Sequence, residues 1–540
     1  MRYYGIRVST GMLAWAVAIG AGASAAAAAG SLSDLTGPWH LFVDDYAVAA
    51  KAGVVRTYHP FEKYAGNPVM VADRPWEGAN VYLYGTTLPN ESGSGYRMWY
   101  HCLNLGVGTY ALYATSADGI RWNKPSLGVV SYNGSTANNI LLPNGCFPSV
   151  MHTPWDADLL RPYKMIYLGS GRFNGAWSVD AMHWTDSPNN PVLPPLSDVG
   201  NFVWDPHIGQ YIGYPKVGAT VNDLKRRAVG YTATTDFESW PSASLILAPD
   251  SWDDRWVPAG TVQRTHFYGL CGFAYESMYL GLLWIFRATD AEGYYDGPIY
   301  VEIVSSHDGI HWTREEGDRP PIIPLGPPGA WDDSMIVTAT HPIVEGGTIR
   351  LYYGGFDDLH AQAKNWHGSI GLATLRKDGF ASLDAGAGGG TITTQKIDRV
   401  SGPLRVNFSA PGGSLKVEVL DETWNVLPGY AEADCNAVSG DSVDQVVTWA
   451  EHAELPTGVA PVRLRFILRN ASVYSFAAGN DAVVIELPTV TQQPADQMVY
   501  AGGRATFTVR ARGTRPLNYQ WQRNGINLTD DGHCVGALTP

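Results

Sequence analysis

The chain has 540 residues, of which 45% are hydrophobic and 16% are charged, so we expect two or three domains that bury substantial cores. Its formal net charge of −14 and the lack of any Lys/Arg-rich run argue against nucleic acid or an anionic membrane surface as a partner. Aromatic residues make up 12% of the chain, which fits either well-filled β cores or flat faces on which ligands stack.

The first 30 residues have the pattern of a secretory signal peptide. Arg2 and Arg7 precede an apolar stretch from Met12 to about Ala29, and this stretch ends in small residues that offer A-x-A cleavage sites. No later segment reaches about 18 consecutive apolar residues, so we expect no membrane span. The pattern predicts a secreted or periplasmic protein, and association with a cell surface stays open. The five scattered cysteines form no metal-type pair and no dense disulfide framework.

A short turn motif recurs along residues 31–385. The copies TSADGIRW, WSVDAMHW, ATTDFESW and SSHDGIHW end at Trp122, Trp184, Trp240 and Trp312, and a weaker copy ends at Phe380. Short alternating strands separate the copies. Four strands per repeat and five repeats predict a five-bladed β-propeller over 31–385, in which the extra piece NPVMVAD (67–73) completes the last blade. The alternative is a flat β-sandwich with coincidental spacing. In the propeller the Asp-Gly turn makes a tight connection and its tryptophan fills the seam between neighbouring blades, so we expect both to be structural.

The remainder also reads as all-β. Residues 386–487 show alternating strands that predict an antiparallel β-sandwich, and residues 488–540 resemble the first half of an immunoglobulin-like module with Trp521 in its core. The predicted fold class is therefore all-β, with a propeller, a sandwich and a partial immunoglobulin-like module.

Polar and aromatic residues next to the innermost strand of each blade are the candidate site. Several acids brought to one axis suggest glycoside hydrolysis, which needs one protonated and one ionised carboxyl group. Taken singly, each acid also fits a solvated loop or a turn cap. The candidate acids are Glu77, Asp205, Glu276 and Asp333, and the candidate substrate-binding residues are Trp76, Asn80, His152, Trp204, His207, Tyr275 and His341.

Three stretches carry a resemblance to a known family. These are DSMIVTATHPIVEGGTIRLYYGG (333–355), HGSIGLATLRKDGFASLDAG (367–386) and the sandwich text between 395 and 476. They resemble the five-bladed propeller hydrolases of glycoside hydrolase families 32 and 43, particularly the family 32 N-terminal-like bacterial proteins. The resemblance implies an oligo- or polysaccharide substrate. VWDP (203–206) is similar to the family's Arg-Asp-Pro element, with Trp204 in place of the arginine. The family's Asn-Asp-Pro-Asn and Glu-Cys motifs are absent.

The sequence hypothesis is therefore an exported glycoside hydrolase without metal or organic cofactor. It takes Glu276 as the general acid, Glu77 or Asp333 as the base or nucleophile, and Asp205 as the stabilising acid. Two alternatives remain: a non-catalytic glycan- or surface-binding propeller, and a polysaccharide lyase using Tyr275 or His341 as base with Arg172 near the uronate.

Overall fold

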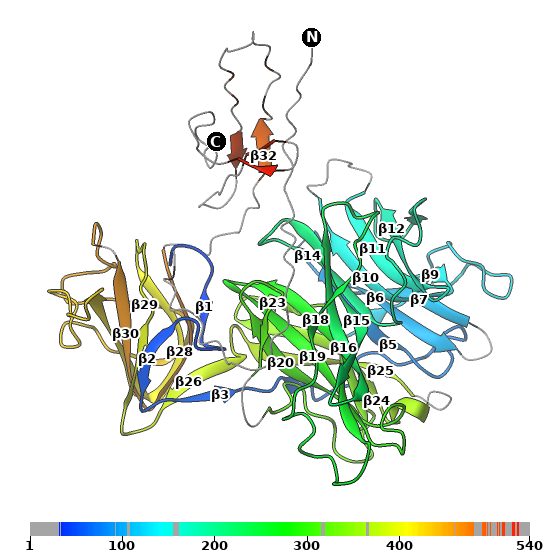
Figure 1. Ribbon diagram of the computed structural model, residues 1–540, viewed down its shortest axis with the longest axis horizontal. Coiled ribbons are helices and arrows are strands. Elements are labelled where there is room, and N and C mark those ends of the chain that lie inside the picture. Colours follow the sequence, from blue (N-terminus) through cyan, green and yellow to red (C-terminus); the bar gives the residue numbers. More distant parts are fainter. Residues whose placement is uncertain are drawn as a thin grey trace. The chain divides into compact units, whose positions relative to one another are not determined.

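A computed structural model describes residues 32 and 34–479, apart from 92, 105–107, 155–160, 315–318, 363–366 and 460, together with short pieces between 489 and 528. Residues 31–480 form one compact unit, and the two terminal segments are grouped in a second. The described part is all-β, as predicted, with one 3-10 turn at His360–Gln362 (Figure 1). None of its helices is long and apolar enough to cross a membrane.

Five antiparallel units, here called blades, follow one another along the propeller region. Blades 4 and 5 are joined by a parallel bridge between Ile299 and Met335. The strands are β5 (Tyr82–Pro89), β6 (Tyr96–Asn104), β7 (Gly108–Ser116), β8 (Trp122–Asn123) and β9 (Ile140–Pro143) in blade 1; β10 (Gly145–His152), β11 (Tyr163–Gly169), β12 (Arg172–Ser178) and β13 (Trp184–Asp186) in blade 2; β14 (Gly200–Asp205), β15 (Gln210–Val221), β16 (Leu224–Thr234) and β17 (Ser244–Leu247) in blade 3; β18 (Arg264–Tyr275), β19 (Met278–Ala288), β20 (Ile299–Ser306) and β21 (Trp312–Thr313) in blade 4; and β22 (Met335–Thr338), β23 (Ile343–Glu345), β24 (Thr348–Phe356), β25 (Ser369–Arg376) and β4 (Glu62–Lys63) in blade 5.

The first strands of the blades contact one another around a ring. The Thr86 hydroxyl of blade 1 accepts a hydrogen bond from Val150 N of blade 2 (2.9 Å) and lies 3.0 Å from the Thr340 hydroxyl of blade 5. Asn201 Nδ2 of blade 3 donates to Leu270 O of blade 4 (3.0 Å). Two further hydrogen bonds complete the ring: Phe202 N of blade 3 donates to Ser149 Oγ of blade 2, and Cys271 Sγ of blade 4 donates to Thr338 O of blade 5. Each inner strand therefore has a neighbour on both sides, which leaves few open sheet edges.

The last blade is closed by the N-terminal segment, as predicted. Met70 bridges Ile370 of β25, and their backbone hydrogen bonds measure 2.9 and 3.1 Å. β4, which precedes the predicted closing piece, pairs with β25 through Lys63 and Glu62. A segment near the start of the propeller thus completes a blade formed about 300 residues later.

The repeated turn is structural. Asp308 Oδ1 accepts hydrogen bonds from Ile310 N (2.8 Å) and His311 N (2.7 Å), and Asp118 and Asp180 hold their own turns in the same way. The tryptophans at the ends of two copies contact the neighbouring blade, since Trp312 meets Tyr214 (5.7 Å between ring centroids) and Trp122 meets Tyr352 (5.4 Å).

The sandwich includes strands that the sequence assigned to the propeller. Within 31–385, the segments His40–Leu41, Val48–Ala52 and Ala381–Ala385 pair with strands beyond 386, and Val55–Tyr58 pairs with Ala381–Ala385. These segments cover edges that the C-terminal strands leave open. The sheet order is β2 (Val48–Ala52), β27 (Gly390–Thr394), β30 (Val462–Arg469), β28 (Leu404–Asp421), β31 (Ala471–Ala478), β26 (Ala381–Ala385) and β3 (Val55–Tyr58), with β1 (His40–Leu41) on β31 and β29 (Val438–Val447) on β28.

The terminal predictions are only partly covered by the described residues. In the predicted immunoglobulin-like tail, β32 (Thr489–Gln492) pairs with β33 (Arg510–Arg512), and β34 (Gln522–Arg523) pairs with β35 (Ile526–Asn527). The rest of that tail and the predicted signal peptide lie outside the described residues. The four described cysteines, Cys102, Cys146, Cys271 and Cys435, are free thiols.

Candidate functional site

The inner strands all run in one direction, so their two ends form two separate faces. Between blades 3 and 4, Asn201 contacts Leu270, and six residues later in each strand His207 Nε2 contacts Glu276 O (2.9 Å). β18 has 12 residues, so at about 3.3 Å per residue its ends lie roughly 35 Å apart. In blade 4, residues before the inner strand and residues after it therefore lie too far apart to share a single site.

Glu77, at the N-terminal face, is enclosed by structural partners. Its side chain has no exposed surface, pairs with Lys124 Nζ at 2.7 Å, and accepts a hydrogen bond from the Tyr100 hydroxyl at 2.8 Å. The backbone N–H groups of Asp73 and Arg74 also donate to it. All of these contacts hold the loop before β5, and they give both oxygens of the Glu77 carboxylate a partner within the protein.

The other predicted residues on the N-terminal face also support loops. Trp76 Nε1 donates to Asn139 Oδ1 (2.8 Å), and the Asn80 amide bonds both the N–H and the carbonyl of Leu103. Asp333 accepts hydrogen bonds from Gly329 N (2.6 Å) and the Ser334 hydroxyl (2.8 Å).

Glu276 lies at the opposite, C-terminal face. It occupies the β18–β19 turn with φ of 50°, accepts a hydrogen bond from Trp39 N (3.0 Å), and lies 3.8 Å from Lys377 Nζ. Burial and the nearby Asp378 raise the pKa of its carboxyl group. A raised pKa suits a general acid, but here it arises where the propeller meets the N-terminal segment and the sandwich.

The remaining predicted residues belong to the same C-terminal face. Asp205 Oδ2 accepts from the Tyr279 hydroxyl (2.8 Å) and its other oxygen from His207 N (2.8 Å). The Tyr275 hydroxyl donates to Asp378 (2.8 Å). Trp204 packs on Tyr211, His152 stacks on Tyr163, and the half-buried His341 lies beside Thr340, with Nδ1 3.0 Å from its hydroxyl. The four predicted acids are thus divided between two ends of the propeller: Glu77 and Asp333 at one, Asp205 and Glu276 at the other.

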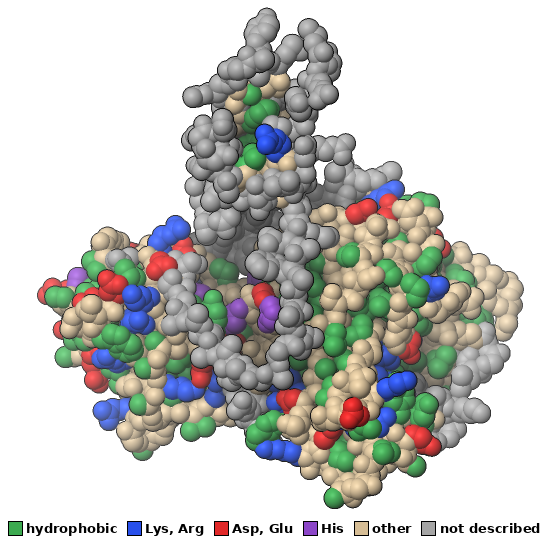
Figure 2. Space-filling model, in the orientation of Figure 1, with side chains coloured by type: hydrophobic (Ala, Val, Ile, Leu, Met, Phe, Trp, Pro, Cys, Tyr) green, Lys and Arg blue, Asp and Glu red, His purple; other side chains and the backbone are tan. Residues whose placement is uncertain are grey.

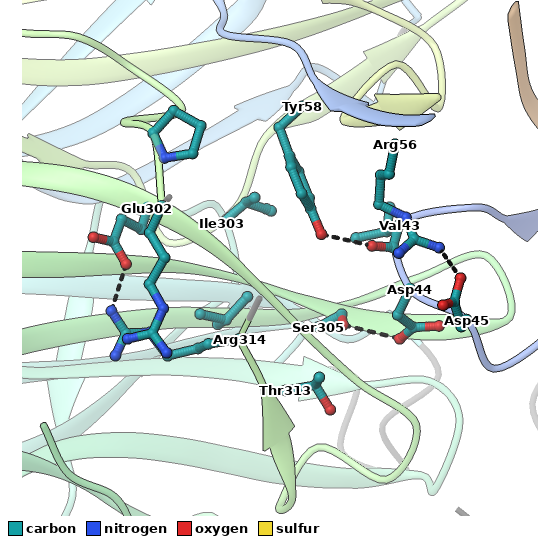
Figure 3. A pocket seen from close by; sticks show the side chains of 13 residues that line it. Val43, Asp44, Asp45, Arg56, Tyr58, Glu302, Ile303, Ser305, Thr313 and Arg314 are labelled. Atoms are coloured by element: carbon teal, nitrogen blue, oxygen red, sulfur yellow. Dashed lines mark hydrogen bonds and ion pairs between the residues drawn. The ribbon is translucent and has the colours of Figure 1, made fainter. Parts of the chain in front are cut away.

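A cavity of about 410 Å³ lies between the N-terminal segment and blade 4 (Figure 3). Its charges are matched by neighbours: Arg314 pairs with Glu302 (2.5 Å), Arg56 pairs with Asp45, and Asp44 accepts from Ser305 (2.9 Å). On the face in view in Figure 2, acidic and basic side chains are interspersed. Because these charged groups are already paired with one another, few of them are left to bind a polar ligand in this cavity.

A second hollow, of about 430 Å³, lies at the N-terminal face between blades 3 and 4. We call it the Tyr268 hollow. Its lining combines three cations, one carboxylate, two tyrosines and a histidine. The lining residues are Ser197, Asp198, Lys216, Val217, Gly218, Arg226, Arg227, Tyr268, Tyr294 and His360.

Asp198 is the carboxylate of the Tyr268 hollow. It precedes β14, its side chain is 61% exposed, and it pairs with Lys216 Nζ at 2.6 Å. Partial burial alone would raise its pKa, but the charge and hydrogen bond of Lys216, with the Ser197 hydroxyl, lower it overall. Asp198 is therefore ionised at neutral pH.

Tyr268 and His360 form a hydrogen-bonded pair. His360 Nδ1 lies 2.8 Å from Tyr295 O, and since a carbonyl can only accept, Nδ1 carries the proton. Burial lowers the pKa of His360, so its ring is neutral and Nε2 accepts from the Tyr268 hydroxyl at 2.9 Å. Burial and the nearby Asp198 raise the pKa of Tyr268, which keeps the phenol protonated.

The loop before β20 is organised by Asp290. Its carboxylate accepts hydrogen bonds from the backbone N–H groups of Tyr294, Tyr295 and Asp296 at 2.8–3.2 Å. These donors outweigh burial and lower the pKa of Asp290 to about 2. The loop presents Tyr294 to the hollow and leaves Tyr295 59% exposed beside it. Fixed tyrosine faces of this kind suit stacking against a flat or ring-shaped ligand.

Among the described residues, one group has the donor types of a metal site. Asp357, Asp358 and His367 follow β24 and have ligand atoms within 4.8 Å of one another. They are largely exposed, and no further observation there points to a ligand.

No family model matches the chain, and no curated protein does. Similar solved structures include a thermostable family-43 glycoside hydrolase (13% identity, TM-score 0.39, covering 61% of this chain and 96% of that one) and an exo-inulinase from Aspergillus awamori (11%, 0.35, 77% and 99%). An N-acetylgalactosamine deacetylase from F. plautii in complex with blood group B trisaccharide is also similar (14%, 0.38, 61% and 97%). Likenesses of this size transfer no residue or activity to this chain.

Proposed function

We propose that the protein is a carbohydrate-active enzyme that binds an oligo- or polysaccharide in the Tyr268 hollow and hydrolyses a glycosidic bond there. The observation that carries the proposal is the meeting, in one hollow, of an ionised carboxylate with a protonated hydroxyl. Hydrolysis requires a negative group to assist attack and a proton donor for the leaving oxygen. Tyr294 in the lining and the exposed Tyr295 beside it supply faces for sugar rings.

Asp198 and Tyr268 take these two roles. Asp198, held ionised by Lys216, acts as nucleophile, as base, or by stabilising positive charge on the anomeric carbon. Tyr268 gives its proton to the leaving oxygen. In sum, water adds its hydroxyl to the anomeric carbon and a proton to the departing sugar.

The Tyr268–His360 pair also favours a second reaction, β-elimination from a uronate. In that reaction a base removes the proton at C5, the electron pair forms a C4–C5 double bond, and the C4–O bond breaks without water. The Tyr268 oxygen takes the C5 proton as its own hydroxyl proton passes to His360 Nε2, so no free phenolate forms, and His360 then returns a proton to the departing O4. Lys216 and Arg227 neutralise the uronate carboxylate.

A panel of neutral and acidic oligosaccharides tests both reactions. New reducing ends without an ultraviolet-absorbing product indicate hydrolysis, and an absorbing unsaturated product indicates β-elimination. Asp198→Asn and Tyr268→Phe should each lose activity by about 100-fold or more. The matched control is Glu276→Gln, which makes the same chemical change at the opposite face. Saturable binding with no product from any substrate would support the non-catalytic binding alternative instead.

Export remains part of the proposal. It is supported by the signal-peptide pattern of residues 1–30 and is checked by N-terminal sequencing of the protein recovered from its host.

A further inference from the structure

The lining of the Tyr268 hollow holds three cations, and only two of them have an ion-pair partner. Lys216 pairs with Asp198, and Arg226 pairs with Asp254 through two contacts of 2.9 and 2.5 Å. Arg227, the third cation of the lining, pairs with no carboxylate within the described part of the chain. The hollow is therefore positive in a chain whose net charge is −14.

The contacts of Arg227 hold its side chain without neutralising it. Nη1 donates to Tyr294 O at 2.6 Å, and the guanidinium carbon lies 4.2 Å from the centre of the Tyr294 ring and 5.1 Å from that of Phe286. A carbonyl and two ring faces fix the orientation of the group. A guanidinium has five N–H donors, so donors remain for a ligand.

Further charges surround the hollow: the cation Arg264 lies behind it, and the ionised Asp290 holds the loop that carries Tyr294. Arg264, which lies behind the hollow 5.8 Å from the Tyr294 ring, donates to the carbonyls of Lys225 and Val262. Lys216 is buried against the Tyr268 ring at 4.3 Å. Burial and the charge of Arg227 lower the pKa of Lys216 against the opposing effect of Asp198, consistent with crowded positive charge.

We propose that the Tyr268 hollow recognises a sugar residue that carries an anionic group, a carboxylate or a sulfate ester. Arg227 is the principal cation, Lys216 the second, and Tyr294 the face on which the sugar ring stacks. A planar guanidinium matches both groups through paired N–H donors. The inference rests on the proposed function for the placement of the glycan in this hollow.

Calorimetry with three probes of equal length tests the inference: trigalacturonate, a sulfated galactotriose and neutral galactotriose. At low salt at least one anionic probe should bind about 10-fold or more tightly than the neutral one, and added salt should reduce this preference. The carboxylate and sulfate probes identify which anion is preferred.

Arg227→Gln should weaken binding of the preferred anionic probe by about 10- to 100-fold and leave the neutral probe unchanged. Arg227→Lys keeps the positive charge and should retain most of the preference for the anionic probe. It therefore keeps the inference testable if the glutamine variant fails to fold. Arg121→Gln makes the same change in the turn between β7 and β8, where the side chain is 90% exposed, and should have no effect. Equal binding of neutral and anionic probes by the wild type would overturn the inference, as would an anion preference that survives in Arg227→Gln.

The two proposals fail in different ways. If an anionic probe binds through Arg227 but no glycan is cleaved, the inference stands and the proposed enzymatic function fails. If neutral glycans are cleaved and the anionic probes are not preferred, the function stands and the inference fails.

Discussion

Replacing Glu77 by glutamine separates a structural carboxylate from a catalytic one. The substitution keeps the size of the side chain and an oxygen that can accept from the backbone N–H groups of Asp73 and Arg74. It removes the charge that faces Lys124, whose side chain is only 4% exposed. Breaking a buried ion pair on one side costs about 3–5 kcal/mol. Asp73 still lies 2.7 Å from Lys124 Nζ, so we expect the lower part of that range or slightly less, about 2–3 kcal/mol.

For a unit of this size, that loss corresponds to a melting temperature lower by about 2–4 °C. Differential scanning calorimetry of the wild type and Glu77→Gln measures the shift. The double variant Glu77→Gln/Lys124→Met, which removes both charges, should recover much of the loss because no buried cation is left unpaired.

Activity decides the interpretation. If Glu77 is structural, folded Glu77→Gln keeps its glycan-cleaving activity at temperatures well below melting. An unchanged melting temperature together with lost activity would refute this reasoning and return Glu77 to the role of catalytic carboxylate.

Three further predictions follow from the contacts. Burial lowers the pKa of His101 and His266 to about 3 and that of His341 to about 4, from the usual 6.5. The stability gained from these neutral rings is complete above pH 6.5 and is lost as the pH falls toward each lowered pKa, by about 1.4 kcal/mol per pH unit for each histidine. The melting temperature should therefore be lower at pH 5 than at pH 7, and an equal or higher value at pH 5 would contradict the burial of neutral histidines. Asp308→Ala removes the acceptor of two backbone N–H groups and should lower the free energy of unfolding in urea by about 1 kcal/mol without changing cleavage, whereas loss of cleavage at full stability would give the repeated motif a catalytic role. Glu276→Gln should leave the initial cleavage rate within about twofold of the wild type, and a loss of about 100-fold would place the chemistry at the C-terminal face.

The propeller could be predicted because its signal is local and repeated. Each copy of the turn carries its own Asp acceptor and tryptophan, so Asp118 and Asp308 build the same structure from the same residues. The strands between His40 and Tyr58 could not be assigned in this way, since their partners lie more than 300 residues away. Alternation identifies a strand but not the sheet edge it covers.

The candidate site was harder to predict because residue type does not specify position along a strand. Asn201 of β14 and Leu270 of β18 contact each other and so lie at the same height in the propeller. Glu276 comes after Leu270 in its strand, whereas Asp198 comes before Asn201, so the two acids lie toward opposite ends. Which end stays open depends on distant segments, such as Trp39 and Lys377 at Glu276. Asp198 in PLSDVG and Tyr268 in THFYG stand at the beginnings of inner strands, and that position was the signal available in the sequence.

A crystal structure with a bound oligosaccharide tests the central claim most directly. An inactive Asp198→Asn variant soaked with a cleavable glycan should hold a sugar ring against Tyr294, with its neighbouring atoms within hydrogen-bond distance of Tyr268 and Arg227. A sugar bound instead at the C-terminal face, between Asp205 and Glu276, would contradict the account.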